Sequence, residues 1–151
     1  RAMPNMGSSV GAGATALAAG SNANNDDLIL AEEIFKTSGE TAIVDESMMD
    51  AVTGLSGSGP AYLFLFLEGM IDAGVRCGLT RPVARTLAEQ TLCGAAKLAK
   101  ESGEHPGTLI DRITSPGGTT IAGLSVLEDA GFKGTIIRAV EAATARSKEL
   151  R

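Results

Sequence analysis

The pattern of apolar and polar positions changes near residue 46 and divides the chain into two parts. Before that point, short apolar runs at 1–5, 13–20 and 41–46 have the length of strands, and the last is rich in β-branched residues. After it, apolar residues return every three or four positions, which is the spacing of amphipathic helices. The pattern predicts a mainly α fold, with a short β/α segment ahead of a helical domain. The expected helices cover 25–37, 47–55, 60–78, 81–102, 106–113, 119–130 and 133–151.

Residues that commonly begin and end helices support these boundaries. The run Asn25–Asp27 can cap the first helix, and Gly39 is its expected C-cap. Ser58 is the expected N-cap of the long helix at 60–78, and Thr80 is that of the helix after it.

The long helix contains a run, "AYLFLFL" at 61–67, that is apolar on every face. Such a helix must be buried on all sides. Glu68 and Asp72 interrupt the run and argue against a membrane span. The other helices are too few to cover it, so we expect an obligate dimer.

Composition narrows the function. The 151 residues carry a net charge of −5 and contain no cluster of Lys and Arg, which argues against a nucleic-acid partner. Cys77 and Cys93 lack the spacing of zinc ligands, so we expect reduced structural thiols in a cytoplasmic protein, and no metal site. The single histidine, His105, is expected to orient the chain ahead of the helix at 106–113. Because the chain starts at Arg1 instead of a methionine, we expect a piece of a longer protein.

Two glycine-rich runs are candidates for ligand binding. Gly11–Ala16 matches G-x-G-x-x-A, but no strand and helix are expected around it as a dinucleotide site requires, so a turn between strands is the better interpretation. The run 115–120, "SPGGTT", precedes an expected helix. Its glycines let a ligand approach the backbone, and the first N–H groups of that helix could bind a carboxylate or phosphate. An ordinary glycine turn with a threonine N-cap is the alternative.

Several blocks, taken together and in order, resemble the pyrroline-5-carboxylate reductase family: "AVTGLSGSGPAY" (51–62), "GEHPG" (103–107), "SPGGTTIAG" (115–123), "LEDAGFKG" (127–134) and "AVEAAT" with Arg146 (139–146). The resemblance implies reduction of the cyclic imine of Δ1-pyrroline-5-carboxylate to L-proline with NADPH or NADH. It also implies that 1–45 is the tail of a Rossmann domain whose phosphate-binding loop lies upstream. Residues 46–151 would be an all-α dimerisation and substrate-binding domain, in a homodimer that can build a larger ring of dimers.

The resemblance further implies the site residues. The substrate-binding residues would be Ser115, Gly117, Gly118, Thr119 and Thr120. The carboxylate would rest on N–H groups around Ser115, Gly118, Thr119 and Thr120, and the Thr120 hydroxyl would face the ring nitrogen as the catalytic side chain.

The segment "MPN" resembles the cofactor side of the family, which would place Pro4 and Asn5 near the nicotinamide. The residues after it, Met6–Ser8, depart from the family pattern. Two other functions stay open: a noncatalytic dimerisation module, or a related NAD(P)-dependent reductase acting on another imine or hydroxy acid.

Overall fold

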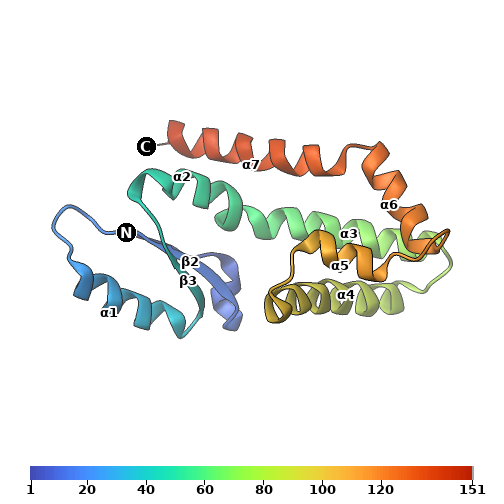
Figure 1. Cartoon of the computed structure of the whole chain (residues 1–151), viewed down its shortest axis with the longest axis horizontal. Coiled ribbons are helices and arrows are strands. Elements are labelled where there is room, and N and C mark those ends of the chain that lie inside the picture. Colours follow the sequence, from blue (N-terminus) through green and yellow to red (C-terminus); the bar gives the residue numbers. More distant parts are fainter. Residues whose placement is uncertain (151) are drawn as a thin grey trace. The chain divides into compact units, whose positions relative to one another are not determined.

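The computed structural model describes residues 1–150 and confirms a mainly α fold with a small sheet at the start. The chain divides into two compact units, Arg1–Leu63 with Gly134–Arg151, and Phe64–Lys133. The strands are β1 (Ala2–Met3), β2 (Gly13–Leu17) and β3 (Gly39–Ile43), and the helices are α1 (Asn25–Lys36), α2 (Met49–Val52), α3 (Gly59–Arg76), α4 (Arg81–Ser102), α5 (Pro106–Ile113), α6 (Thr119–Asp129) and α7 (Phe132–Glu149) (Figure 1). Short 3-10 turns cover Met6–Val10 and Glu46–Met48, and a π-turn covers Thr53–Gly57.

The sheet has the order β1-β2-β3. The β1 strand is antiparallel to β2, whereas β2 and β3 are parallel and are connected through α1, which is a βαβ unit. Gly39 pairs with Gly13 in this register and begins β3, so its expected role as the C-cap of α1 is wrong; Thr37 takes that position. Gly39 has a φ of 149°, and an added Cβ would lie 2.0 Å from the Gly13 carbonyl oxygen. Close approach of two strands therefore requires this glycine.

The N-cap of helix α1 is Asn24, one residue before the run 25–27 expected to cap it. The Asn24 side chain accepts hydrogen bonds from the N–H groups of Asp26 and Asp27, at 2.7 and 3.1 Å. The Asp27 carboxylate in turn accepts from the Asn24 N–H at 2.9 Å. These bonds form a capping box, which satisfies donors that an uncapped helix start would leave unpaired.

The expected helix at 47–55 is instead a 3-10 turn, the single turn α2 and the π-turn. The predicted N-cap at Ser58 is also wrong. Ser58 has helical backbone angles, φ −84° and ψ −21°, and its N–H donates to the Thr53 carbonyl at 2.8 Å. The backbone therefore runs from α2 into α3 without the extended residue that an N-cap needs.

The core of the first unit is small. It consists of Ala16, Ala18 and Met49, with Met3, Val44 and Val52 packed against them. Asp50 is buried beside this core and accepts a hydrogen bond from the Ser147 hydroxyl of α7 at 2.8 Å. Gly54 lies so close to α7 that an added Cβ would be 2.7 Å from the Val140 carbonyl oxygen. Helix α7 thus contacts α2 and the π-turn Thr53–Gly57.

In the second unit, α4 packs against the last turns of α3 through small residues. An added Cβ on Gly74 would lie 2.9 Å from the Cβ of Ala84, and Ala84 and Ala88 are buried. An ion pair between Arg81 and Asp72, at 2.9 Å, joins the same two helices. The rings of Phe66 and Phe132 lie 6.0 Å apart between their centroids.

The apolar helix α3 contains no buried residue in the single chain. Leu63, Phe64 and Leu65 are 54%, 59% and 71% exposed. The burial expected on all its sides is therefore not provided by this chain alone. Within residues 1–150, no helix combines the length and the apolar character needed to cross a bilayer.

Candidate functional site

The run Ser115–Gly118 forms a tight turn in the second unit. The Gly118 N–H donates to the Ser115 carbonyl at 3.0 Å, which closes a β-turn with Pro116 and Gly117 at its centre. Gly117 has a φ of 67°, a conformation that glycine adopts without strain. Pro followed by a glycine of positive φ is the signature of a type II turn. The two residues thus form the bend ahead of α6.

Helix α6 starts without a side-chain cap. Gly118 is its N-cap residue, with extended backbone angles, and among the described residues no side chain accepts a hydrogen bond from the first turn as a cap. The alternative of a threonine N-cap is therefore wrong, because Thr119 and Thr120 already lie inside the helix. The first N–H groups of a helix have no intrahelical acceptor, and the helix dipole is positive at that end. This arrangement can bind one negatively charged group.

Hydroxyl groups surround this helix start. Ser115 and Thr119 are exposed, and Thr120 is half-buried. The Ser115 hydroxyl lies directly over Gly118, since an added Cβ there would be 2.3 Å from Ser115 Oγ. The turn therefore brings the predicted substrate residues together in one loop, with donors from both backbone and side chains.

The predicted cofactor residues lie in the other unit, just after β1. Pro4 is exposed and Asn5 is half-buried. The Asn5 amide is occupied within the protein: Oδ1 accepts from the N–H groups of Gly7 and Ala14, both at 3.1 Å, and Nδ2 donates to the Ser56 carbonyl at 3.1 Å. A direct contact between Asn5 and a cofactor stays a prediction.

The run Gly11–Ala16 does not have the geometry of a dinucleotide loop. Gly11 ends the 3-10 turn with a φ of 71°, and Gly13–Leu17 is strand β2. A pyrophosphate site needs a helix that begins at the glycine run, and the structure has a strand there instead. Only Gly11 and Ala12 lie in the expected connection between two strands, because residues 13–16 already belong to β2.

His105 has the role expected for it, which is to orient the chain ahead of α5. It is the N-cap residue of α5, and its Nδ1 accepts a hydrogen bond from the Gly107 N–H at 3.1 Å.

Sequence reasoning did not find Asp50, whose burial depends on α7, a helix far along the chain. Cys77 and Cys93 are free and exposed. Among residues 1–150, no three side chains of the metal-binding types gather in one place.

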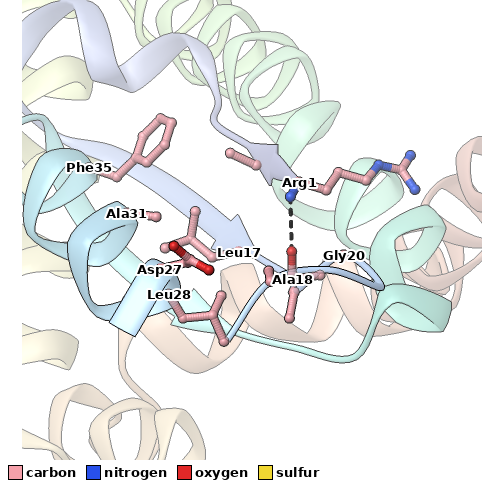
Figure 2. Close-up of a pocket in the computed structure, with 11 residues that line it drawn as sticks. Arg1, Leu17, Ala18, Gly20, Asp27, Leu28, Ala31 and Phe35 are labelled. Atoms are coloured by element: carbon pink, nitrogen blue, oxygen red, sulfur yellow. Dashed lines mark hydrogen bonds between the residues drawn. The ribbon is translucent and has the colours of Figure 1, made fainter. Parts of the chain in front are cut away.

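Two hollows lie in the first unit. One, of about 290 Å³, is bounded by α1 and the ends of β1 and β2; Figure 2 shows Leu28, Ala31 and Phe35 facing Leu17 across it. The N-terminal ammonium group of Arg1 donates to the Ala18 carbonyl at its edge, at 2.9 Å (Figure 2). The other, of about 380 Å³, lies beside β3. The residues that line these hollows are mostly apolar and include none of the predicted site residues.

Fold and site together define a class of protein. Along the chain a βαβ unit is followed by helices; the most apolar of them, α3, has no buried residue in the single chain, and α6 begins without a side-chain cap. This is an association domain joined to the end of an α/β sheet. Residues 46–150 match the family described as pyrroline-5-carboxylate reductase dimerisation. The chain belongs to the pyrroline-5-carboxylate reductase family.

Individual relatives agree with this assignment. A pyrroline-5-carboxylate reductase of Synechocystis sp. is 54% identical over 99% of this chain and 56% of its own length. The crystal structure of a pyrroline carboxylate reductase from Plasmodium falciparum with NADP bound has a TM-score of 0.91 at 41% identity, over 98% of this chain and 61% of that one. The enzyme from Coxiella burnetii has a TM-score of 0.96 at 44% identity, over 99% of this chain and 56% of that one. The chain spans about half the length of the curated relatives it matches.

Proposed function

We propose that the protein containing this chain reduces Δ1-pyrroline-5-carboxylate to L-proline with NADPH or NADH, the last step of proline biosynthesis. The observation that carries the proposal is the turn at Ser115–Gly118 ahead of an uncapped α6, in a chain of this family. The substrate has one carboxylate, and an uncapped helix start with neighbouring hydroxyls can hold one without a cationic side chain.

In this proposal the loop fixes the substrate. The carboxylate rests on the N–H groups of the α6 start around Gly118 and Thr119, next to the Ser115 hydroxyl, while Gly117 shapes the bend. The Thr120 hydroxyl orients the ring nitrogen of the imine. The ring nitrogen takes a proton from solvent before the transfer, so hydride adds to the carbon of an iminium ion and the C=N electron pair becomes the lone pair of the product amine. Catalysis then depends mainly on positioning, because this transfer needs alignment more than a strong acid or base from the protein.

The described residues fit only part of the cofactor. When bound, NADPH or NADH supplies the hydride. Pro4 presents an exposed surface at the end of β1 that suits the nicotinamide end. The run Gly11–Ala16 passes from a 3-10 turn into strand β2 and does not suit the pyrophosphate. The Plasmodium falciparum structure has NADP bound, which supports the choice of cofactor.

We further propose a domain boundary at residues 45 and 46, which makes 1–45 the tail of a Rossmann domain and 46–151 the dimerisation and substrate-binding domain. The family match begins at residue 46, and β3 ends at Ile43. The exposed apolar surface of α3 supports a homodimer, with a ring of dimers as a larger assembly. The free cysteines fit a reducing compartment such as the cytoplasm.

For the 151 residues alone, a second function is favoured by the absence of a dinucleotide loop within the described part of the chain. This piece would be a noncatalytic dimerisation module. Equilibrium titration of the isolated chain with NADPH tests the idea, and tight binding would contradict it.

The reductase proposal is tested with the full-length protein by following NADPH oxidation with pyrroline-5-carboxylate, beside other cyclic imines and hydroxy acids. Thr120→Ala should lower kcat/KM by about 10- to 100-fold, since it removes a hydrogen bond to a polar or charged substrate group. Thr108→Ala, an exposed position in α5, is the matched control and should stay within about twofold.

Absence of turnover in a folded parent protein would refute the reductase function. Equal losses in the two variants would instead refute the assignment of the site to the Ser115–Thr120 loop. Preference for another imine or a hydroxy acid would favour the related-reductase alternative.

A further inference from the structure

Asn5 uses both polar atoms of its side chain inside the first unit. Its Oδ1 accepts from the N–H groups of Gly7 and Ala14, and its Nδ2 donates to the Ser56 carbonyl, all at 3.1 Å. These partners fix the orientation of the amide. A reversed amide would point its NH2 group at two N–H donors and its oxygen at a carbonyl.

The sequence explains why the Ser56 carbonyl can accept a hydrogen bond from Asn5. In an α-helix, the carbonyl of Ser56 would accept from the N–H of residue 60. That residue is Pro60, which has no N–H. The backbone is a π-turn at this place, with the Ser58 N–H bonded to the Thr53 carbonyl at 2.8 Å. The Ser56 carbonyl therefore accepts a hydrogen bond from outside the helix, and the donor is Asn5 Nδ2.

A second contact joins the same two segments. The end of the Met3 side chain lies against Gly57, where an added Cβ would be 2.8 Å from the Met3 methyl carbon. One segment is the end of β1 with the residues after it, and it contains Pro4 and Asn5, which are expected near the nicotinamide. The other is the π-turn Thr53–Gly57, which leads into α3. A polar and an apolar contact thus connect the proposed cofactor side of the chain to the start of the long helix.

We propose that Asn5 is a positioning residue for hydride transfer: it locks the segment after β1 onto the π-turn Thr53–Gly57 and does not contact the cofactor through its amide. This role rests on the proposed reductase function. It differs from the direct cofactor contact that the family resemblance implies for Asn5.

The decisive variant is Asn5→Asp in the full-length protein. Above neutral pH the introduced carboxylate still accepts from two N–H groups but places a charged oxygen against the Ser56 carbonyl. The two N–H donors stabilise this carboxylate, whereas the Ser56 carbonyl repels it. Protonation converts one oxygen to an O–H donor and restores the pattern of the amide. The kcat relative to the parent should be about tenfold lower near pH 8 and should rise as the pH falls toward the pKa of the introduced carboxyl.

Two controls accompany it. Asn5→Leu has a similar size but neither bonds nor titrates, so its kcat should stay low at every pH. Asn24→Asp makes the same chemical change at the cap of α1, where the side-chain oxygen alone is used, and should follow the parent at every pH. The Kd for NADPH should stay within about twofold in all three variants.

A tenfold or greater rise in the Kd for NADPH with unchanged kcat would show direct cofactor contact and overturn the proposal, as would an Asn5→Asp variant with the kcat of the parent at pH 8. A second measurement needs no variant: in the parent protein without NADPH, the amide protons of Gly7 and Ala14 should exchange slowly with solvent. Fast exchange that slows only on adding NADPH would also overturn it. Because exchange is read without turnover, its result stands apart from any failure of the reductase function.

Discussion

At the scale of single residues, close backbone contacts decide which glycines can be replaced. Gly39 adopts a positive φ and faces Gly13 across the sheet, with no room for a Cβ. Gly118 is a milder case, because the nearest atom to an added Cβ is the Ser115 hydroxyl, which can rotate away. The first glycine therefore serves the fold, and the second serves the loop proposed to bind substrate.

Gly39→Ala should lower the free energy of unfolding by about 3 kcal/mol or more, because it combines a strained φ with a backbone clash. Gly20→Ala is the matched control, since nothing lies within 4 Å of its added Cβ and its φ is not positive. It should change stability by less than about 1 kcal/mol. Urea unfolding of the full-length variants measures both, and equal midpoints would contradict the argument.

At the scale of elements, local capping sets some helix starts and long-range contacts set the geometry of others. Helices α4 and α5 each begin after an extended residue, and each has a proline in its first turn: Pro82 in α4 and Pro106 in α5. These helix starts follow from nearby sequence alone. The region from α2 to α3 differs. Its π-turn is held by Asn5 on one segment and packs against α7 at Gly54, so distant segments stabilise its geometry.

His105→Ala should destabilise α5 by about 1 kcal/mol, because it leaves the Gly107 N–H without its acceptor. His105→Asn should retain most of the stability, since its side-chain oxygen can cap in the same place. Amide hydrogen exchange over Thr108–Ile113 reports this directly. Unchanged exchange in the alanine variant would show that the cap does not stabilise α5.

At the scale of the whole molecule, the chain leaves its most apolar helix uncovered. Leu65 is 71% exposed and Phe64 is 59% exposed. Exposed apolar surface of this kind marks an interaction site. It fits the dimerisation family that residues 46–150 match, and it explains how a chain with 44% apolar residues buries so few of them alone.

Leu65→Glu should disrupt the homodimer, because a charge would then be buried in the proposed interface without a partner. Analytical ultracentrifugation should give the mass of a dimer or of a ring of dimers for the parent protein, and of a monomer, or of a mixture shifted by dilution, for the variant. Asn22→Glu adds the same charge at an exposed position between β2 and α1 and should leave the dimer intact. A Leu65→Glu variant that stays a dimer would place the interface elsewhere.

The sequence by itself determined the mainly α fold, helix bounds such as those of α4 and α5, and the turn at Ser115–Gly118. These features depend on periodicity, prolines and glycines that act within a few residues. Only the tertiary structure decided the pairing of Gly39 with Gly13, the burial of Asp50 beside Ser147, and the bond from Asn5 to Ser56, residues that are 51 positions apart. Such contacts form between elements whose relative placement no local pattern encodes, so the residue predicted at the cofactor proved to be hydrogen-bonded to its own protein.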